Sequence, residues 1–322
     1  MRIRILGTGL ADGGPVETAA ALSERLGRSE RWIVSRAGVA ERHVSDRPME
    51  QLAAEAVQRA LGDGPRPDLL MNASLTPVQL IPDSSVFIQE ALGWSGLGIP
   101  SWSVHATCLS FVVALQQAGA LITTGAFRRV VVVSAEVGST CRNFDEPESA
   151  ALIGDGAAAV VLEATPEGES SALLGFDMST WPDGSRHAEI RGCGNRQFPL
   201  DPQTKPVDYL FHMNGPALFR GAYPRVDQLL DRLLGRAGLR REDVDLIVPH
   251  QASGPALDAL VRLGFPSERT VRIIERYGNC IAASIPMALA VADAEGRLRR
   301  GDTVLLLGTG AGLSVAGALL RW

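Results

Sequence analysis

The chain of 322 residues has little of several features that define common protein classes. It has a single lysine, Lys205, and a formal net charge of −5, and no basic stripe interleaved with aromatic residues, which argues against a general nucleic-acid-binding protein. No apolar run approaches the ~18 residues of a membrane-spanning helix, and no signal-peptide core precedes the first strand-like segment. We therefore expect a cytoplasmic protein with no membrane insertion and no nucleic-acid partner.

Cysteines and aromatic residues are also scarce. The four cysteines, Cys108, Cys141, Cys193 and Cys280, lie far apart, with no CxxC pair and no histidine at a ligand spacing. This pattern excludes a zinc ribbon and disfavours a disulfide framework, so we expect no metal site. Aromatic residues make up only 5% of the chain, whereas hydrophobic residues make up 46%. The length and composition suit one large α/β unit, or two domains of about 150 residues, with an aliphatic core.

Hydrophobic periodicity predicts strands and helices that alternate along the chain. Expected strands cover residues 2–9, 68–74, 129–135, 243–248, 271–274 and 303–307, and expected helices cover 18–26, 49–61, 84–92, 214–234 and 254–263. Gly154-Asp155-Gly156 is predicted to be a tight turn before a buried strand, because no Gly-Lys-Ser/Thr follows it. Residues 166–206 are polar and rich in glycine and proline, which predicts an irregular insertion and a boundary between halves 1–165 and 166–322.

The segment around Trp32 shows little periodicity of either kind. It places an indole near three arginines, Arg31, Arg36 and Arg42. An indole beside guanidinium groups can stack a nucleotide base and hold phosphates. The alternative is a surface loop with solvated charges.

An internal repeat relates the two halves. The segment that Cys108 opens continues through Ala114-Leu115 to a Gly-and-Arg turn and then to the strand Val130–Val133. The segment that Asn279 opens continues in the same way to the strand 303–307. This match predicts two related βαβ halves about a pseudo-twofold axis, with Cys108 and Asn279 at equivalent helix N-termini. A site between such halves is a common place for small-molecule chemistry.

Three polar residues are predicted at the ends of buried elements. Cys108 is expected in the first turn of a buried helix, where unpaired N–H groups and the helix dipole stabilise the nucleophilic thiolate. His250 follows a predicted strand and could serve as the basic partner of the thiol. Each residue also has a structural alternative: a buried small apolar residue for Cys108, a core histidine for His250 and an N-cap for Asn279.

Taken together, the motifs of this chain resemble the β-ketoacyl-ACP synthase III branch of the thiolase superfamily. The resemblance extends over nearly the whole chain. The matching motifs, in order, are Trp32-Ile33-Val34 with Arg36-Ala37-Gly38 and Glu41-Arg42-His43, Ala106-Thr107-Cys108, Gly154-Asp155-Gly156-Ala157, Pro249-His250-Gln251-Ala252, Gly278-Asn279 with Ala282-Ala283-Ser284, and Gly310-Ala311-Gly312-Leu313-Ser314.

The resemblance implies a five-layered αβαβα thiolase-like fold and, as in most members, a homodimer. It implies acyl transfer from acyl-CoA or an acyl carrier protein to Cys108, then condensation with a malonyl-type thioester, without a cofactor. The backbone N–H groups of Cys108 and Gly312 would form the oxyanion hole. His250 and Asn279 would be the neutral donors that stabilise the enolate formed by decarboxylation.

The resemblance also implies roles for peripheral residues. Trp32 and Arg36 would line the nucleotide and pantetheine entrance, and Arg220 and Arg262 would bind an acidic carrier protein. Ile81 would lie where the partner subunit limits the acyl pocket.

This chain departs from the family pattern at several positions. Ser253 replaces an asparagine, Pro255 replaces a basic residue, and Glu146-Pro147-Glu148 lies where an arginine usually completes the adenine site. Because acidic residues repel the phosphates of CoA, a carrier-bound donor is favoured.

Three functional hypotheses follow from this comparison. The first is a decarboxylative condensing enzyme of fatty-acid initiation or of a specialised lipid or polyketide pathway. The second is an acyltransferase that delivers the Cys108-bound acyl group to a hydroxyl or amine, with His250 as general base. The third is a non-catalytic subunit of a heterodimer, which the complete Cys108, His250 and Asn279 set disfavours.

Overall fold

Two β-sheets form the frame of the molecule. The computed structural model describes residues 1–322. The first sheet has the order β1-β7-β6-β4-β5, with β1 at Ile3–Asp12, β4 at Leu69–Asn72, β5 at Ser101–Ser103, β6 at Arg129–Glu136 and β7 at Gly156–Ala164. The second has the order β11-β12-β13-β8, with β8 at Ala172–Thr180, β11 at Leu246–Pro249, β12 at Thr303–Gly310 and β13 at Ser314–Arg321. The predicted boundary at 165–166 lies in the connection between β7 and β8.

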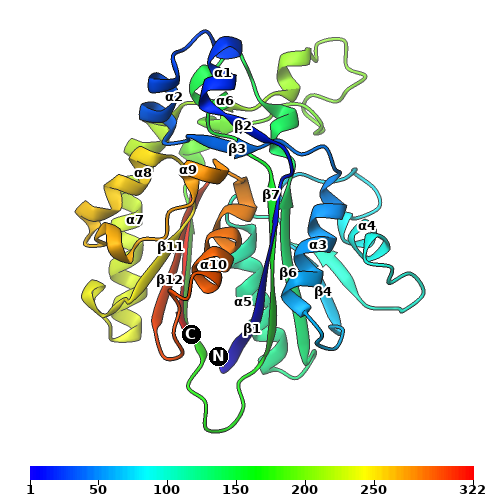
Figure 1. Cartoon of the computed structure of the whole chain (residues 1–322), viewed down its shortest axis with the longest axis vertical. Coiled ribbons are helices and arrows are strands. Elements are labelled where there is room, and N and C mark those ends of the chain that lie inside the picture. The colour runs from blue at the N-terminus through cyan, green and yellow to red at the C-terminus, as the bar shows by residue number, and fades with distance from the viewer.

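Five layers result from the way helices cover these sheets (Figure 1). Helices α5 (Ser110–Thr123) and α10 (Ser284–Ala294) lie between the two sheets. Helix α3 (Met49–Leu61) packs on the outer face of the first sheet beside α4 (Ser84–Ala91), and α7 (Gly215–Ala237) packs on the outer face of the second. Helix α10 is buried over most of its surface because it contacts both sheets, which explains its nearly continuous apolar sequence.

The second sheet repeats the strand order of the first. Strands β8, β13, β12 and β11 follow one another as β1, β7, β6 and β4 do, and α7 and α10 correspond to α3 and α5. The strand pairs β4–β6 and β11–β12 are parallel, and the other pairs of these series are antiparallel. The repeat seen in the sequence therefore has a structural counterpart in two pseudo-symmetric halves.

Shorter elements cover the end of the sheets opposite the two termini (Figure 1). They are β2 (Val16–Thr18), α1 (Ala19–Leu26), α2 (Glu30–Ala37), β3 (Glu41–His43), α6 (Pro147–Ala150), β9 (Ala188–Glu189), β10 (His212–Met213), α8 (Gly254–Asp258) and α9 (Ile274–Tyr277). Several start at the caps that their sequences provide: Thr18 and Ser29 accept a backbone N–H at the starts of α1 and α2, and Asn214 does so for α7. No helix of the structure is long and apolar enough to cross a membrane.

The structure corrects four expected elements. Trp32 lies in helix α2 rather than in a loop, because Ser29 caps the segment and Ile33 and Ala37 provide its buried face. Residues 172–180 of the expected irregular insertion form β8, which pairs with β13. Residues 271–274 form no strand, although the preceding Thr270 makes an isolated bridge to Ile247 where β5 would have its counterpart. The expected helix 254–263 changes to a 3-10 helix at Ala259.

Glycine permits the close packing of α3 against β1. A methyl group added at Gly9 would lie 2.1 Å from the carbonyl oxygen of Ala56 and 2.4 Å from the backbone nitrogen of Ala60. We expect Gly9→Ala to lower the free energy of unfolding by about 1–3 kcal/mol, because strand and helix must separate. Gly235→Ala is the matched control: it adds the same group in open space on helix α7 and should stabilise the protein by about 0.5–1 kcal/mol. Urea unfolding of both variants measures the difference, and equal effects would contradict this account.

Candidate active site

Cys108 lies in a tight elbow just before α5. The preceding residue, Thr107, has a positive φ of 52°, and the helix begins at Ser110, two residues after the thiol. The Ser110 hydroxyl donates to the carbonyl of Thr107 (2.7 Å) and accepts from the backbone N–H of Ala106 (2.9 Å). These bonds fix the elbow. The expectation that Cys108 belongs to the first turn of the helix is therefore wrong by two residues.

The elbow packs directly against β12 of the other half. A methyl group added at Gly310 would lie 2.6 Å from Oγ1 of Thr107, and one added at Gly308 would lie 2.8 Å from Leu109 and 3.2 Å from Cβ of His250. Gly308 thus separates the segment that carries Cys108 from the residue His250. The absence of side chains at these two glycines brings the thiol of one half to the end of β12 in the other.

Burial raises the pKa of the Cys108 thiol to about 12. The negative charge of Glu136 raises it further, whereas the backbone N–H groups of Ala311 and of Cys108 itself lower it. Cys108 as a whole residue is half-buried. Burial of its thiol is nevertheless the largest cause of the raised pKa. The expectation of a thiolate stabilised by the helix start is thus wrong for the free protein, because desolvation outweighs the N–H groups.

His250 follows β11 and is 6% exposed. Its backbone N–H donates to the carbonyl of Leu307 on β12 (2.8 Å), which continues the pairing of the two strands. Burial lowers the pKa of the imidazole to about 4, because desolvation disfavours the charged form. Its Nδ1 atom has no protein partner, so no protein group fixes the tautomer. His250 is therefore a neutral imidazole at physiological pH, free to accept or donate one proton.

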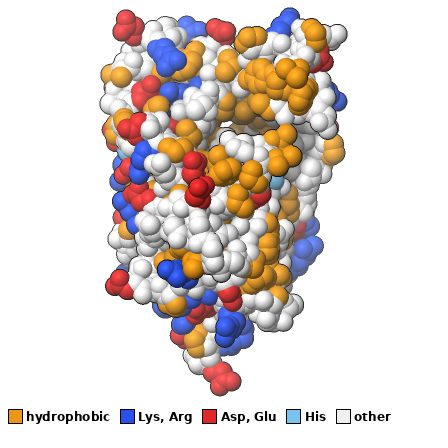
Figure 2. Space-filling view, turned by 90° about the vertical axis from the view of Figure 1, so that its right-hand side faces the viewer, with side chains coloured by type: hydrophobic (Ala, Val, Ile, Leu, Met, Phe, Trp, Pro, Cys, Tyr) orange, Lys and Arg blue, Asp and Glu red, His pale blue; other side chains and the backbone are white.

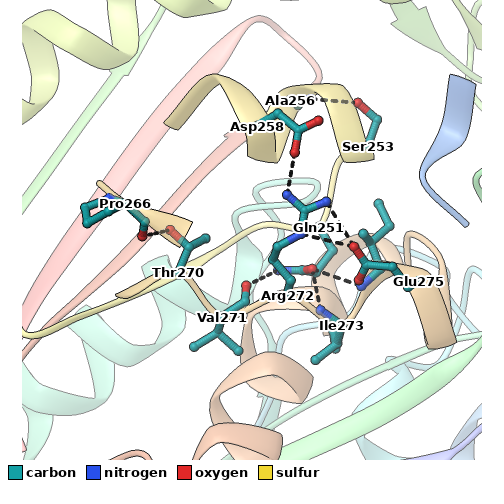
Figure 3. Close-up of polar contacts among 11 residues, drawn as sticks. Gln251, Ser253, Ala256, Asp258, Pro266, Thr270, Val271, Arg272, Ile273 and Glu275 are labelled. Atoms are coloured by element: carbon teal, nitrogen blue, oxygen red, sulfur yellow. Dashed lines mark hydrogen bonds and ion pairs between the residues drawn. The ribbon is translucent and has the colours of Figure 1, made fainter. Parts of the chain in front are cut away.

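The side chain of Gln251, the residue after His250, makes hydrogen bonds to the segment around Val271 and Ile273 (Figure 3). Its buried amide donates to the carbonyls of Pro249 (2.8 Å) and Val271 (3.2 Å) and accepts the backbone N–H groups of Ile273 (2.9 Å) and Ile274 (3.1 Å). One side chain thus satisfies three backbone groups of residues 271–274, which form no strand, and one carbonyl at the end of β11. The position of His250 depends on this fully bonded amide.

Asn279 lies close to the segment that follows His250. Its Nδ2 donates to the carbonyl of Ala252 (3.3 Å), and its Oδ1 accepts the backbone N–H of Ile281 (2.9 Å). Its backbone pairs with the first half, where Asn279 N–H donates to Leu152 (2.8 Å) and Gly154 N–H donates to the carbonyl of Asn279 (3.1 Å). Asn279 does not open α10, since a 3-10 turn lies between it and Ser284. The Nδ2 group keeps a second hydrogen for a ligand.

The Gly154-Asp155-Gly156 segment supports Asn279 from the side of the first half. A methyl group at Gly154 would lie 2.1 Å from the carbonyl oxygen of Tyr277, two residues before Asn279. The buried Asp155 carboxylate accepts hydrogen bonds from the backbone and hydroxyl groups of Ser139 and from the backbone N–H of Ser45. The predicted tight turn at Gly154-Asp155-Gly156 is wrong, because the N–H groups of Gly154 and Asp155 donate to the distant carbonyls of Asn279 and His43 and the turn lies earlier, at Ala151-Leu152.

The residues expected to form the oxyanion hole are adjacent in the structure. The N–H groups that point at the Cys108 sulfur are those of Cys108 and Ala311. Gly312, the residue expected from the resemblance, is the next residue and has a φ of 145°. The N–H next to the sulfur, besides that of Cys108, is thus that of Ala311 and not that of Gly312.

Trp32 and Arg36 lie on α2, outside the central contacts. Trp32 is half-buried, with the guanidinium of Arg28 5.5 Å from its ring centroid, and Arg36 is exposed in the last turn of the helix. Helix α2 reaches the site through Gly38, where an added methyl group would lie 2.5 Å from Cα of Gly254. Both residues therefore lie on the element that leads to the segment after His250.

Arg220 and Arg262 lie on neighbouring elements, and Ile81 lies elsewhere. Neither arginine takes part in an ion pair, and the guanidinium of Arg262 lies 5.7 Å from the ring centroid of Tyr223. Ile81 is 79% exposed and contributes to no core of the single chain. The structure thus places the two arginines on one surface and Ile81 on another.

The acidic substitution near the expected nucleotide site has a structural role. The Glu146 carboxylate accepts the backbone N–H of Met213 (3.1 Å) and makes a close contact with Nδ1 of His212. It thereby fastens β10 to the start of α6. No arginine occupies the position where the family pattern has one, and no group of three His, Cys, Asp or Glu side chains is placed to hold a metal ion.

Comparisons with known proteins agree with this architecture. Family models of 3-oxoacyl-[acyl-carrier-protein (ACP)] synthase III match residues 103–182 and, for its C-terminal part, residues 234–322. The Erythrobacter litoralis β-ketoacyl-[acyl-carrier-protein] synthase III is 36% identical over 329 residues that span both chains. The crystal structure of the 3-oxoacyl-(acyl carrier protein) synthase III of Pseudomonas aeruginosa PAO1 superimposes with a TM-score of 0.90 at 32% identity, covering 100% of this chain and 98% of that one. The Aquifex aeolicus VF5 structure gives 0.89 at 30%, covering 99% and 100%.

Two pseudo-symmetric α/β halves, with Cys108 in one and His250 and Asn279 in the other, define the thiolase-like class of condensing enzymes. Within that class the chain belongs to the β-ketoacyl-ACP synthase III family.

Sequence reasoning missed three residues of the site. In the sequence Gln251 stands out only as part of the motif Pro249-His250-Gln251-Ala252, although a glutamine beside a strand end in an apolar context signals a buried amide that needs partners. Glu136 ends the apolar run of β6, and a carboxylate in that position is a comparable signal. Nothing in the sequence distinguished Ala311 from Gly312 as the N–H donor.

The burial of His250 gives a prediction about its charge. The imidazole should stay neutral from about pH 5 upward and take up a proton only near pH 4, because burial disfavours the imidazolium. NMR of protein with ¹⁵N-labelled histidine measures this, and a His250→Asn variant identifies the signal. A His250 signal that titrates near its ordinary value of about 6.5 would contradict the buried neutral ring.

Proposed function

We propose that this condensing enzyme transfers an acyl group from a thioester to Cys108 and then carries out a decarboxylative Claisen condensation with a malonyl-type thioester. The observation that carries the proposal is that the elbow of Cys108 and Cβ of His250 both pack on the glycines of β12, while the Asn279 amide bonds to Ala252, two residues after His250. A nucleophile and two neutral donors are the groups that these two steps require.

In the first step, the Cys108 sulfur attacks the thioester carbonyl while its proton passes to His250. Transfer to the imidazole is needed because a thiol with a pKa of about 12 does not ionise by itself near neutral pH. The N–H groups of Cys108 and Ala311 stabilise the oxyanion. The tetrahedral intermediate then expels the donor thiolate, which takes the proton from His250. Acyl-Cys108 and neutral imidazole remain.

In the second step, the malonyl-type thioester loses CO₂, and its carbonyl oxygen takes the electron pair as an enolate. The N–H of neutral His250 and the free Nδ2 hydrogen of Asn279 stabilise that charge. The enolate carbon attacks acyl-Cys108 and forms the new C–C bond, and the Cys108 thiolate leaves and is protonated. Neutral donors suit this step because a charged imidazolium is disfavoured in the buried site.

The test is CO₂ release and product mass when acyl-loaded enzyme meets malonyl-ACP. We expect CO₂ and a product two carbons longer than the starter. Cys108→Ala should abolish loading, whereas Asn279→Ala should leave loading within about twofold and slow CO₂ release by roughly 100-fold, as for the loss of one oxyanion donor. Mass spectrometry of the acyl-enzyme reports the loading step separately.

Other outcomes point to the alternative functions. Loading without CO₂ release would favour transfer of the acyl group to a hydroxyl or amine acceptor, with His250 as general base. Absence of any adduct at Cys108 would favour a non-catalytic subunit. Equal loss of both steps in Asn279→Ala would contradict the role given to the amide.

We also propose that the acyl donor is bound to a carrier protein. Arg220 and Arg262 are unpaired cations near the exposed Phe219. Arg225, which lies between them in the sequence, is paired with Asp183 (2.8 Å). This surface suits an acidic partner. The free carboxylate of Glu148, exposed near the expected nucleotide entrance, disfavours the phosphates of CoA.

The double variant Arg220→Ala/Arg262→Ala tests this proposal. We expect a rise of about tenfold in KM for an acyl-carrier donor, lost at high salt, and little change for the matched acyl-CoA. Arg66→Ala is the control, because Arg66 is an exposed, unpaired arginine at the opposite end of the molecule. Faster loading of the unmodified enzyme from acyl-CoA than from acyl-ACP would overturn the carrier preference.

We further propose a homodimer in a reducing, cytoplasmic setting. Figure 2 shows the side of the molecule that carries α4, where hydrophobic side chains gather in the upper and middle parts. Leu80, Ile81, Val86 and Leu97 of α4 and its flanking loops are exposed, and β5 is a free sheet edge next to them. A second copy would cover this face and receive Ile81 at its acyl pocket. The four unpaired cysteines support the cytoplasmic location.

A further inference from the structure

Glu136 is a buried carboxylate behind the thiol that the steps above do not use. It is the last residue of β6 and is 0% exposed. Its hydrogen-bond partners are all neutral groups, and it takes part in no ion pair. A buried carboxylate without a cation is costly, so its presence calls for a reason beyond packing.

The carboxylate joins two segments that surround the site. It accepts the backbone N–H groups of Leu75 (2.5 Å) and Thr76 (3.0 Å) and the Thr76 hydroxyl (2.7 Å). It also accepts the backbone N–H of Ala282, three residues after Asn279. The first contact fixes the start of the loop that carries Leu80 and Ile81. The second fixes the turn that follows the catalytic amide.

The same charge also faces the cysteines of this region. It acts on Cys108, and it acts on Cys141 and Cys280 as well, which also face the carboxylate of Asp155. Among charged side chains, Cys108 is affected by Glu136 alone. After burial, which is the largest cause, Glu136 is the charged side chain that raises the pKa of the Cys108 thiol.

We propose that Glu136 is a positioning residue for this site: its buried carboxylate ties the loop that begins at Leu75 to the turn after Asn279 and places one acidic group beneath the site. The inference rests on the proposed function in one respect, the role of Cys108 as nucleophile. The free enzyme then holds a protonated thiol, which resists adventitious electrophiles and gives up its proton only to His250 during acylation.

The charge of Glu136 is itself sensitive to pH. Burial raises its pKa to about 7, so the carboxyl is neutral in mildly acidic solution and ionised above neutrality. Ionisation of Glu136 raises the pKa of the thiol. As the pH passes through about 7, the amount of Cys108 thiolate should therefore rise by less than the tenfold per pH unit of an isolated thiol.

The experiment is alkylation of Cys108 by iodoacetamide between about pH 5.5 and 9.5, read by mass spectrometry of the Cys108 peptide. In the unmodified protein we expect a shallower section of the rate profile around pH 7. In Glu136→Gln that section should vanish. The rate should match the unmodified protein near pH 5.5 and exceed it about threefold or more at pH 8.5, equal to half a pKa unit.

Two further variants separate charge from position. Glu136→Asp keeps the charge but shortens the reach, so the shallow section should remain while hydrogen exchange in residues 73–82 and 281–284 rises. Thr76→Val removes a hydroxyl donor that lowers the pKa of Glu136, so the shallow section should remain and move to higher pH. A ratio of the Glu136→Gln alkylation rate to the unmodified rate that does not change with pH would overturn the role of the charge. If Glu136→Gln fails to fold, an unmodified profile without the shallow section would overturn it as well. Unchanged exchange in Glu136→Asp would overturn the positioning role.

These measurements need no acyl donor. Failure of the unmodified enzyme to load or to release CO₂ would count against the proposed function and leave the alkylation result readable. Normal loading together with a featureless alkylation profile would count against Glu136 alone.

Discussion

The contact of the Cys108 elbow with β12 is the constraint on which the site depends. The elbow can lie against the strand only because Gly308 and Gly310 present hydrogen where any other residue would present a carbon. His250 and Leu109 both pack on Gly308. The missing side chain of this one glycine therefore determines how closely the segment of Cys108 approaches His250. The two halves meet where side chains of the elbow pack directly on the glycine backbone of β12, which leaves little room for adjustment.

The pKa values of Cys108 and His250 are set mainly by exclusion of water from the site and not by pairing with opposite charges. Burial alone accounts for the low pKa of His250 and is the largest cause of the high pKa of Cys108. The resting pair is therefore neutral, and ionisation accompanies chemistry instead of preceding it. An account based on the helix dipole alone would have the sign of the thiol shift wrong, because it omits desolvation and the buried carboxylate of Glu136.

The sequence was most informative where a polar residue borders a long apolar run. His250 follows such a run and Cys108 and Asn279 precede one, and the internal repeat indicated that the latter two occupy equivalent places. It was least informative where the backbone conformation depends on distant partners. The segment after Thr270 has strand-like residues, yet the amide of Gln251 satisfies its N–H groups instead of a neighbouring strand. Likewise, Trp32 joins a helix because of a serine cap and two buried positions that a short window does not resolve.

Both chain ends lie at the same end of the molecule, away from the elbow (Figure 1). Strand β12 begins beside Trp322 and runs for eight residues to Gly310 at the site, a span of about 25 Å. The Met1 amino group is bonded to Leu173, at the start of β8 on the same side. A domain or surface anchor joined at either end would therefore leave the thiol open to a docking partner. A circular permutant, with the two chain ends joined and the chain opened at an exposed loop elsewhere, would test whether the protein folds when the second half precedes the first in the sequence.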